Sequence, residues 1–503
     1  MSKPEEEKIS RRNYLQLAGG TIAGLVVGGA LGYLGKPTVT APAETVTSTA
    51  TQTVTVTGTA TPPPVTTATP AQVIDFYVNP DLAGTELDIM AYDTIDTVNA
   101  KKFIDEFQTI TGIKPVWTVM AESDANDKLS LEFAAKSGTF ALDYNSMDGS
   151  FVYNNAIAGN CLPLNDWFAK CPKEYNIDDV LKPTVQASST DDGTIYGSLW
   201  DCGNHWLAYR KDLFDAENVK VPTNLDELVA AAEHFYRPDK GLYGIALFGT
   251  PDLFPFFHWD MFIWGCGGKH LDETTMEPLA NSPEVIEGTE YYAECGKYAI
   301  DWANCEINKP TTYFAAGKAA MELNFVTALA PVLDPTTSVV YDKTGFAPWP
   351  GKVSQPNILT ATGYSVNAYS DPKAQEAAFS LLTFFTSPHV QAQALKPDYG
   401  WPPMRASVAE APENQPDVNT KWGWMAPTIK AIISAQPPGT KGAASVAASP
   451  LPRIPKPGVS FGYMKIIYTN FAKVVAGTWT AEQAMDQSQN DLVDLFKTNG
   501  LLK

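Results

Sequence analysis

The stretch ELDIMAYDTIDTVNAKKFIDEFQTITGIKPVWTVM, residues 86–120, decides the fold of this chain. Its first part, Glu86 to Tyr92, is a short apolar run that predicts a buried strand. The next part, Thr97 to Ile110, carries apolar side chains at helical spacing, and Gly112 follows as a stop signal. Residues 115–120 predict a second strand. This strand–helix–strand order is typical of a mainly parallel sheet with helices on its faces.

Later segments carry recognisable helix starts. In the helix predicted between Pro222 and Phe235, Thr223 is the expected N-cap and Asp226 stands three residues later. Proline at the first helical position opens two further helices, at Pro283 and at Pro372. The chain has 503 residues. Because single hydrophobic cores stop growing at about 250–300 residues, we expect at least two α/β lobes.

The charge and the motif content argue against several functions. The formal net charge is −20, which disfavours nucleic acid, since that ligand requires clustered Lys and Arg. The five histidines show no metal-ligand spacing, so neither a metal nor a cofactor is predicted. No G-x-S-x-G, H-E-x-x-H, Walker or G-x-G-x-x-G pattern occurs, and no catalytic residue is predicted. A secreted glycoside hydrolase or lyase remains an alternative, because sequence alone does not exclude two suitably spaced carboxylates.

The N-terminus has the features of an export signal. Residues 10–16, SRRNYLQ, resemble the twin-arginine signal, and the apolar segment from Leu15 to Gly35 follows directly. A helix of this length reaches about 31 Å, enough to span a bilayer. We therefore predict that residues 1–37 are a signal and membrane anchor. Cleavage at Ala41-Pro42-Ala43 with release of the protein is the alternative.

Residues 38–70 predict an extended stalk. Fourteen of these 33 residues are Thr, prolines cluster at Pro62, Pro63 and Pro64, and neither Lys nor Arg occurs. Such a segment buries too little apolar surface to offset the entropy of ordering it, and Thr-rich, Pro-bearing tracts are often O-glycosylated. A stalk is useful only when its far end is held, which favours an uncleaved anchor with the globular part outside the membrane.

The six cysteines include no C-x-x-C pair. An even number of cysteines in an exported chain permits disulfides. Two pairs have equal spacing, Cys161 with Cys171 and Cys295 with Cys305, and we expect them to be bonded. Cys202 with Cys266 is the third expected pair. Buried free thiols are the alternative.

A series of short motifs continues along the chain. They are YGSLWD (196–201) with YRKDLF (209–214), GCGG (265–268), FAAGKAAM (314–321), FAPWPG (346–351), TGYSV (362–366) and GWPPMR (400–405). In this order they resemble the extracellular solute-binding proteins of ABC sugar importers, the group that includes maltose-binding protein. Leu199 and Arg210 stand where that family usually has Pro and Asn. The resemblance covers about residues 85 to 500.

The resemblance implies a periplasmic-binding-protein-like fold of class II, with two α/β lobes and a ligand in the cleft between them. Closure on the ligand would be a hinge movement. The two-lobe domain would cover residues 71–503, with chain crossings near residues 200–204, 348–357 and 395–401. The first lobe would hold about 85–200 and 357–395, and the second about 205–348 and 402–503.

A carbohydrate is the expected ligand. Sugars lie with their apolar faces on aromatic rings, and the chain has 12 Trp, several of them at the presumed crossings. The aromatic pattern and the resemblance together indicate these ligand-binding residues: Tyr92, Asp93, Asp148, Trp200, Asp201, Trp259, Asn324, Trp349, Tyr364, Trp401, Phe461 and Tyr463. Core packing is the competing interpretation for each ring, because Trp is mostly buried in any protein.

The resemblance also implies partners. We expect a monomeric receptor, outside the cell membrane, that delivers an oligosaccharide to ABC permease subunits with a cytoplasmic ATPase. A receptor of the same fold for a peptide or a polyamine is the alternative, and the acidic composition would suit a polyamine.

Overall fold

The structure is a computed structural model. It describes residues 74–93, 95–120, 122–145, 149–203, 205–251, 253–272, 274–325, 329–358, 360–395, 403–414, 444–447, 452–456 and 459–502. All of them belong to one compact unit, Gln72–Lys503. The predicted anchor and stalk, residues 1–37 and 38–70, lie outside the described residues. In the described part, no helix combines the length and apolarity that a membrane crossing needs.

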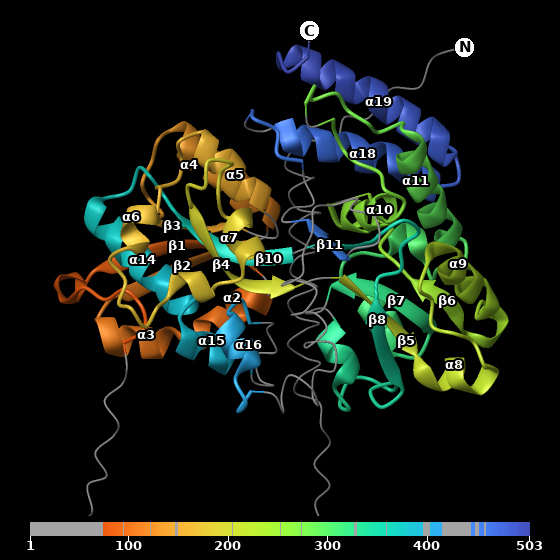
Figure 1. The fold of residues 1–503 in the computed structure, drawn as a ribbon, viewed down its shortest axis with the longest axis horizontal. Helices are drawn as coiled ribbons and strands as arrows, with labels where there is room; N and C mark the ends of the chain where they lie inside the picture. The colour runs from red at the N-terminus through yellow and green to blue at the C-terminus, as the bar shows by residue number, and fades with distance from the viewer. Residues whose placement is uncertain are drawn as a thin grey trace, which may run out of the picture. The chain divides into compact units, whose positions relative to one another are not determined.

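The first lobe is built on a five-stranded sheet with the order β2-β1-β3-β10-β4 (Figure 1). Strand β1 pairs in parallel with both β2 and β3, whereas β10 is antiparallel to β3 and to β4. The parallel strand–helix–strand unit predicted from residues 86–120 is therefore confirmed. The strands are β1 (Glu86–Tyr92), β2 (Lys114–Met120), β3 (Leu142–Asn145), β4 (Gly197–Gly203) and β10 (Thr360–Val366).

The single helix predicted between Thr97 and Ile110 is two helices, α2 (Ile95–Lys101) and α3 (Ile104–Thr111). The break comes at residues 102–103, where both amides bond to carbonyls three residues back and Phe103 is buried. Gly112 ends α3 with a φ of 71°, as predicted, since glycine tolerates the left-handed conformation. The other helices here are η1 (Pro80–Leu82), α4 (Glu122–Ala134), α5 (Gly149–Ile157), α6 (Asn165–Phe168), η2 (Ile177–Asp179), α7 (Lys182–Ala187), α14 (Pro372–Phe385), α15 (Pro388–Ala394) and α16 (Ala406–Glu410).

Helix α14 forms the centre of the first lobe's core. It begins after Asp371, whose side chain accepts a hydrogen bond from the Lys373 amide, and all its residues from Ala377 to Phe385 are buried. The residues that precede β1 pack against this helix. The Phe76 ring lies 5.1 Å from that of Phe384. Residues 74–84 therefore belong to the first lobe, although the sequence motifs begin only at about residue 85.

The second lobe is built on a four-stranded sheet with the order β6-β7-β5-β8. These strands are β5 (His205–Arg210), β6 (Tyr243–Ala246), β7 (Ala319–Phe325) and β8 (Thr344–Pro348). Helices α18 and α19 lie side by side at the end of the chain (Figure 1). The helices are α8 (Lys211–Glu217), α9 (Leu225–His234), η3 (Pro238–Lys240), α10 (Leu253–Gly265), α11 (Pro283–Gly296), η4 (Trp302–Asn304), α12 (Lys309–Ala315), η5 (Ala330–Leu333), α18 (Val459–Val475) and α19 (Ala481–Thr498).

The helix predicted to start at Pro283 is confirmed, whereas the predicted N-cap of α9 is wrong by one residue. The side chain of Asn224, not of Thr223, accepts the hydrogen bond from the Glu227 amide, at 2.9 Å. Thr223 instead donates from both its amide and its hydroxyl to the Glu227 carboxylate, at 2.8 Å each. Asn and Thr are both good caps. Here the Thr223 hydroxyl is bonded to the Glu227 carboxylate, and Asn224 caps the helix.

The lobes are joined where β4 leads to β5 and where β9 (Gln355–Ile358) leads to β10. A third connection was expected near residues 395–401, followed by a return to the second lobe at residue 402. Residues 396–402 lie outside the described residues. The Leu181 amide donates to the carbonyl of Met404, and Arg405 Nε donates to that of Thr386, at 2.6 Å. Val408 and Ala409, which follow, belong instead to a buried cluster with Trp206 of the second lobe. Strand β11 (Ala444–Ala447) then pairs in parallel with β9.

The predicted disulfides are not present. Cys161, Cys171, Cys266, Cys295 and Cys305 are free, and the side chain of Cys202 lies outside the described residues. The thiol of Cys161 instead donates to the hydroxyl of Ser365 on β10, at 3.3 Å. Burial raises the pKa of Cys161 and of Cys305 to about 12, so both stay protonated. These thiols behave as small apolar core groups.

Candidate functional site

The strand ends of the first lobe meet at one edge of its sheet. Strands β1, β2 and β3 are parallel and end together, and the start of β10 lies beside the end of β4, with Thr360 opposite Gly203. Asp93 follows β1 directly and is exposed, and its amide bonds to the carbonyl of Met120 at 2.7 Å. Among the described residues, this edge also carries the connections from β4 to β5 and from β9 to β10.

The second lobe presents a matching edge. His205, the first residue of β5, lies opposite Phe325, the last residue of β7. Pro348, the last residue of β8, lies opposite Trp206 and is followed by Trp349. Ligands of open α/β sheets bind at strand ends, and small-molecule sites favour the junction of two domains. These two edges therefore form the candidate ligand-binding site.

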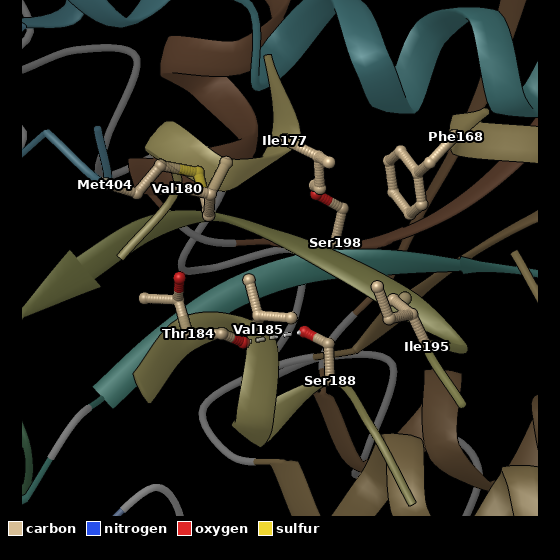
Figure 2. A pocket seen from close by; sticks show the side chains of 10 residues that line it. Phe168, Ile177, Val180, Thr184, Val185, Ser188, Ile195, Ser198 and Met404 are labelled. Atoms are coloured by element: carbon tan, nitrogen blue, oxygen red, sulfur yellow. Dashed lines mark hydrogen bonds between the residues drawn. The ribbon is translucent and has the colours of Figure 1, made fainter. Parts of the chain in front are cut away.

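A small pocket lies within the first lobe, away from these two edges. Figure 2 shows this cavity beside β4, lined mainly by α7, η2 and Phe168, with Met404 at one side. Its volume is about 10 Å³, roughly the room that one water molecule requires. Ligand pockets enclose on the order of 300–1,000 Å³. The cavity is too small for a sugar and is a packing gap within the first lobe.

The predicted ligand residues of the first lobe lie mostly beneath its edge. Tyr92, Trp200 and Tyr364 are at most 1% exposed and belong to the hydrophobic core. The rings of Trp200 and Tyr364 lie 5.3 and 5.9 Å from the ring of Phe385. The predicted residues Asp148 and Trp401 lie outside the described residues, and Asp201 is on β4 with its side chain outside them.

Three predicted residues of the second lobe, Trp259, Trp349 and Tyr463, are part of its core. The indole Nε1 of Trp259 donates to the hydroxyl of Thr289 at 2.8 Å, which joins α10 to α11. The Tyr463 hydroxyl donates to the His270 carbonyl at 3.3 Å, and both side chains are buried. Phe461 is on α18 with its side chain outside the described residues. The polar atoms of Trp259 and Tyr463 are thus satisfied within the protein.

Asn324 lies close to the edge, on β7, within a buried polar cluster. Its Nδ2 donates to the Thr311 hydroxyl at 3.1 Å and to Glu322 Oε1 at 2.8 Å, and Thr311 donates to the same carboxylate at 2.6 Å. Burial raises the pKa of Glu322 to about 7, because a charged carboxylate is costly in an apolar environment. The Asn324 amide is thus already engaged by neighbouring side chains.

Trp349 is a core residue that directly follows β8 at the second-lobe edge, where it lies within a cluster of rings. The His205 and His258 rings lie 5.9 and 5.3 Å from its ring, and the Phe325 ring lies 5.9 Å from His205. Burial lowers the pKa of His205 to about 3 and lowers that of His258, so both imidazoles are neutral. His205, His258 and Phe325 were not among the predicted residues, although His205 follows directly on a predicted crossing.

Several polar atoms of this cluster, including both ring nitrogens of His258, lack a hydrogen-bond partner among the described residues. Nδ1 and Nε2 of His205 and Nε1 of Trp349 are buried and have no hydrogen-bond partner among the described residues. Within that part of the chain, no group of His, Cys, Asp or Glu side chains is placed to hold a metal ion. The arrangement offers neutral hydrogen-bonding groups among aromatic faces. That chemistry suits an uncharged polar ligand.

Comparison with known proteins gives curated relatives and solved structures of similar fold. The chain is 27% identical to the mannitol-binding protein of Pseudomonas aeruginosa, over 59% of this chain and 66% of that protein. It is 23% identical to the maltotriose-binding protein of Pyrococcus abyssi, over 50% of this chain and 56% of that protein. The chain therefore spans less than two thirds of each of these relatives.

A solute-binding protein of an ABC transporter from Agrobacterium radiobacter, in complex with ribitol, shares the fold with a TM-score of 0.72. Its identity to this chain is 24%, over 82% of this chain and all of that chain. The two-lobe periplasmic-binding-protein-like fold expected from the motifs is thereby confirmed. The family model described as bacterial extracellular solute-binding protein matches residues 102–427, more than half of the chain. This chain belongs to the bacterial extracellular solute-binding protein family.

Proposed function

We propose that this protein is the extracytoplasmic receptor of an ABC importer and that it binds an uncharged carbohydrate or polyol. The observation that carries the proposal is the family match across both lobes, together with two sheets whose strand ends meet at the chain crossings. The relatives support the ligand class, because they are a mannitol-binding protein, a maltotriose-binding protein and a solute-binding protein in complex with ribitol. All three of these ligands are polyhydroxylated and carry no charge.

The composition of the candidate site supports the same ligand class. An aromatic ring packs well against the C–H face of a sugar, and the second-lobe edge holds Trp349 and Phe325 beside two neutral histidines. The described groups of this ring cluster carry no charge, so they offer no counter-ion for a polyamine or for a charged peptide terminus. The preference for an oligosaccharide over a smaller polyol rests on the sequence alone.

Export, anchoring and assembly complete the proposal. The twin-arginine-like residues 10–16 and the apolar segment after them support export, and the Thr-rich stalk supports retention by an uncleaved anchor. The receptor would act as a monomer and pass its ligand to permease subunits with a cytoplasmic ATPase. Ligand that contacts both lobes would favour the closed arrangement, which the permease would recognise. No catalytic role is proposed.

The proposal is tested by thermal unfolding of the purified protein with mannitol, ribitol, maltose, maltotriose and longer oligosaccharides. Spermidine and a mixture of peptides are the controls. Ligand at about 100 times its Kd adds about 2.7 kcal/mol to the native state, which raises Tm by about 3 °C in a chain of this size. A rise with a polyol or a sugar supports the proposal. A rise with spermidine or peptides alone contradicts the ligand class, and consumption of an oligosaccharide contradicts the receptor role.

A further inference from the structure

Three buried nitrogen atoms at the second-lobe edge need a partner that the described protein does not supply. They are Nδ1 and Nε2 of His205 and Nε1 of Trp349. His205 is 0% exposed and Trp349 is 1% exposed. More than nine in ten buried polar groups of native proteins are hydrogen-bonded, because an unpaired one costs free energy. A molecule that bonds to these atoms at the candidate ligand-binding edge would remove that cost.

The local structure does not give these atoms a purely structural role. His205 and Leu207 share one face of β5, and on that face Leu207 packs into the second-lobe core beneath α10. The His205 ring is surrounded by the rings of His258, Phe325 and Trp349. A phenylalanine in place of His205 would fill this space without unsatisfied nitrogens. An imidazole at this position is useful if its nitrogens have a partner when the site is filled.

The chemistry of the atoms defines that partner. A neutral imidazole has one donor and one acceptor, and an indole has one donor. A hydroxyl group is both a donor and an acceptor, so it pairs with either imidazole nitrogen and accepts from the indole. The surrounding rings suit a carbon frame that bears such hydroxyls. An ionic ligand is disfavoured, because the imidazoles carry no charge to pair with it.

We propose that His205 and Trp349 form a hydroxyl-recognition site at the second-lobe edge, in which both side chains hydrogen-bond the hydroxyls of a polyol or sugar ligand. The proposal rests on the carbohydrate function proposed above and names residues that decide its specificity. His205 also links this site to the hinge, since its amide donates to Asn357 Oδ1 on β9 at 2.9 Å. A ligand held by His205 is thus bonded to a residue that is itself fixed to the second interlobe connection.

The test measures ligand affinity and stability together. The variants are W349F, which removes the indole donor and keeps an aromatic ring, and H205F, which removes both nitrogens. Isothermal titration with mannitol, ribitol and maltotriose should show affinity reduced between about twofold and tenfold for each lost hydrogen bond. The Tm of H205F without ligand should stay constant or rise, because an unsatisfied buried group has been replaced by a ring of similar size. W349F should lower Tm modestly, because the smaller ring leaves a cavity. H205Q, which keeps a donor and an acceptor, should recover part of the affinity.

The matched control is W302F, also in the second lobe. The Trp302 Nε1 donates to the carbonyl of Phe248 at 2.8 Å, so this variant loses a bond that the protein makes with itself. It should lower Tm and leave affinity unchanged. Wild-type affinity in both W349F and H205F would overturn the proposed site. A loss of affinity that is no larger than the loss of stability explains would overturn it as well. A wild-type protein that binds none of the three ligands would instead overturn the proposed function and this site with it.

Discussion

The contact made by Arg453 predicts how firmly the two lobes hold the arrangement seen here. Arg453 lies between β11 and α18, next to Ile454, which is buried in the second-lobe core. Its Nη1 lies 3.0 Å from Asp191 Oδ1, and its Nη2 donates to the carbonyl of Gln186 at 2.6 Å. Its guanidinium also lies 5.2 Å from the ring centre of Tyr153. All three partners belong to the first lobe.

The free energy that Arg453 contributes to the interlobe arrangement depends on how exposed each of its partners is. The Asp191 side chain is 74% exposed, and such solvent-screened pairs contribute about 0–1 kcal/mol. A hydrogen bond from a charged donor contributes about 1.5–3 kcal/mol when well buried, and a partly exposed cation–π contact about 0.5–1 kcal/mol. Because the Arg453 side chain is itself 26% exposed, we expect its three contacts together to stabilise the interlobe arrangement by about 2 kcal/mol. That energy corresponds to a population change of about 30-fold.

The change R453M keeps the aliphatic stem and removes the guanidinium. Without ligand, R453M should show a larger radius of gyration in small-angle scattering, because the arrangement loses an interlobe contact. Its apparent Kd should rise by up to about 30-fold, since apparent affinity scales with the population of the binding-competent state. D191N should raise Kd less than about fivefold, because that partner is exposed.

R237M is the matched control, because Arg237 makes a two-bond pair with Glu217 inside the second lobe, at 2.8 and 2.6 Å. Its scattering and Kd should equal those of the wild-type protein. The reasoning is refuted if R453M leaves the radius of gyration unchanged and the Kd within twofold. It is refuted equally if R237M produces the same change as R453M, since the effect would then not depend on an interlobe contact.

Four further outcomes are expected. Burial raises the Glu322 pKa from 4.5 to about 7. Between these pH values the native state keeps a proton that the unfolded chain has released, so the free energy of unfolding falls as pH rises through this window. E322Q should therefore reduce the fall in Tm between pH 5 and pH 8. F76A should lower the free energy of unfolding by about 3–5 kcal/mol. The change I74A should lower it by only about 0.5 kcal/mol or less, because Ile74 is partly exposed. T289V, which leaves the buried Trp259 donor without its acceptor, should cost about 1–3 kcal/mol in denaturant unfolding. Alkylation of the unfolded chain without reductant should label all five thiols described as free. A labelled protein whose mass lacks two of these alkyl groups would contradict this, because it would contain a disulfide.

Elements with local signals were predictable from the sequence. Strand β1 has the predicted bounds, and the helices opened by Pro283 and Pro372 start there, because proline at N1 acts within a few residues. The division of the helix between Thr97 and Ile110 was not predictable, because its apolar stripe continues through the break at Phe103. Burial of Phe103 in the core is a tertiary effect that overrides the local pattern.

The segment after α15 illustrates a different limit. The motif GWPPMR resembles a turn of the family, and nothing in it reveals that Arg405 is fully buried with its Nε bonded to a backbone carbonyl. Strand β11 pairs in parallel with β9, and these segments lie almost 90 residues apart in the sequence. Long-range pairing of this kind leaves no local signal, so the sequence does not predict that β11 joins β9.

The candidate site shows why residue type alone does not identify a ligand contact. Trp259 and Trp349 were predicted as binding residues on similar grounds, and both are about 1% exposed. They differ in one respect, which is that Trp259 finds an acceptor in Thr289 on α11, whereas Trp349 has none among the described residues. Whether an indole donor is satisfied depends on a neighbour brought close by the fold. The property that indicates a ligand is therefore absent from the sequence pattern and arises when the strand ends, α10 and the chain connections come together.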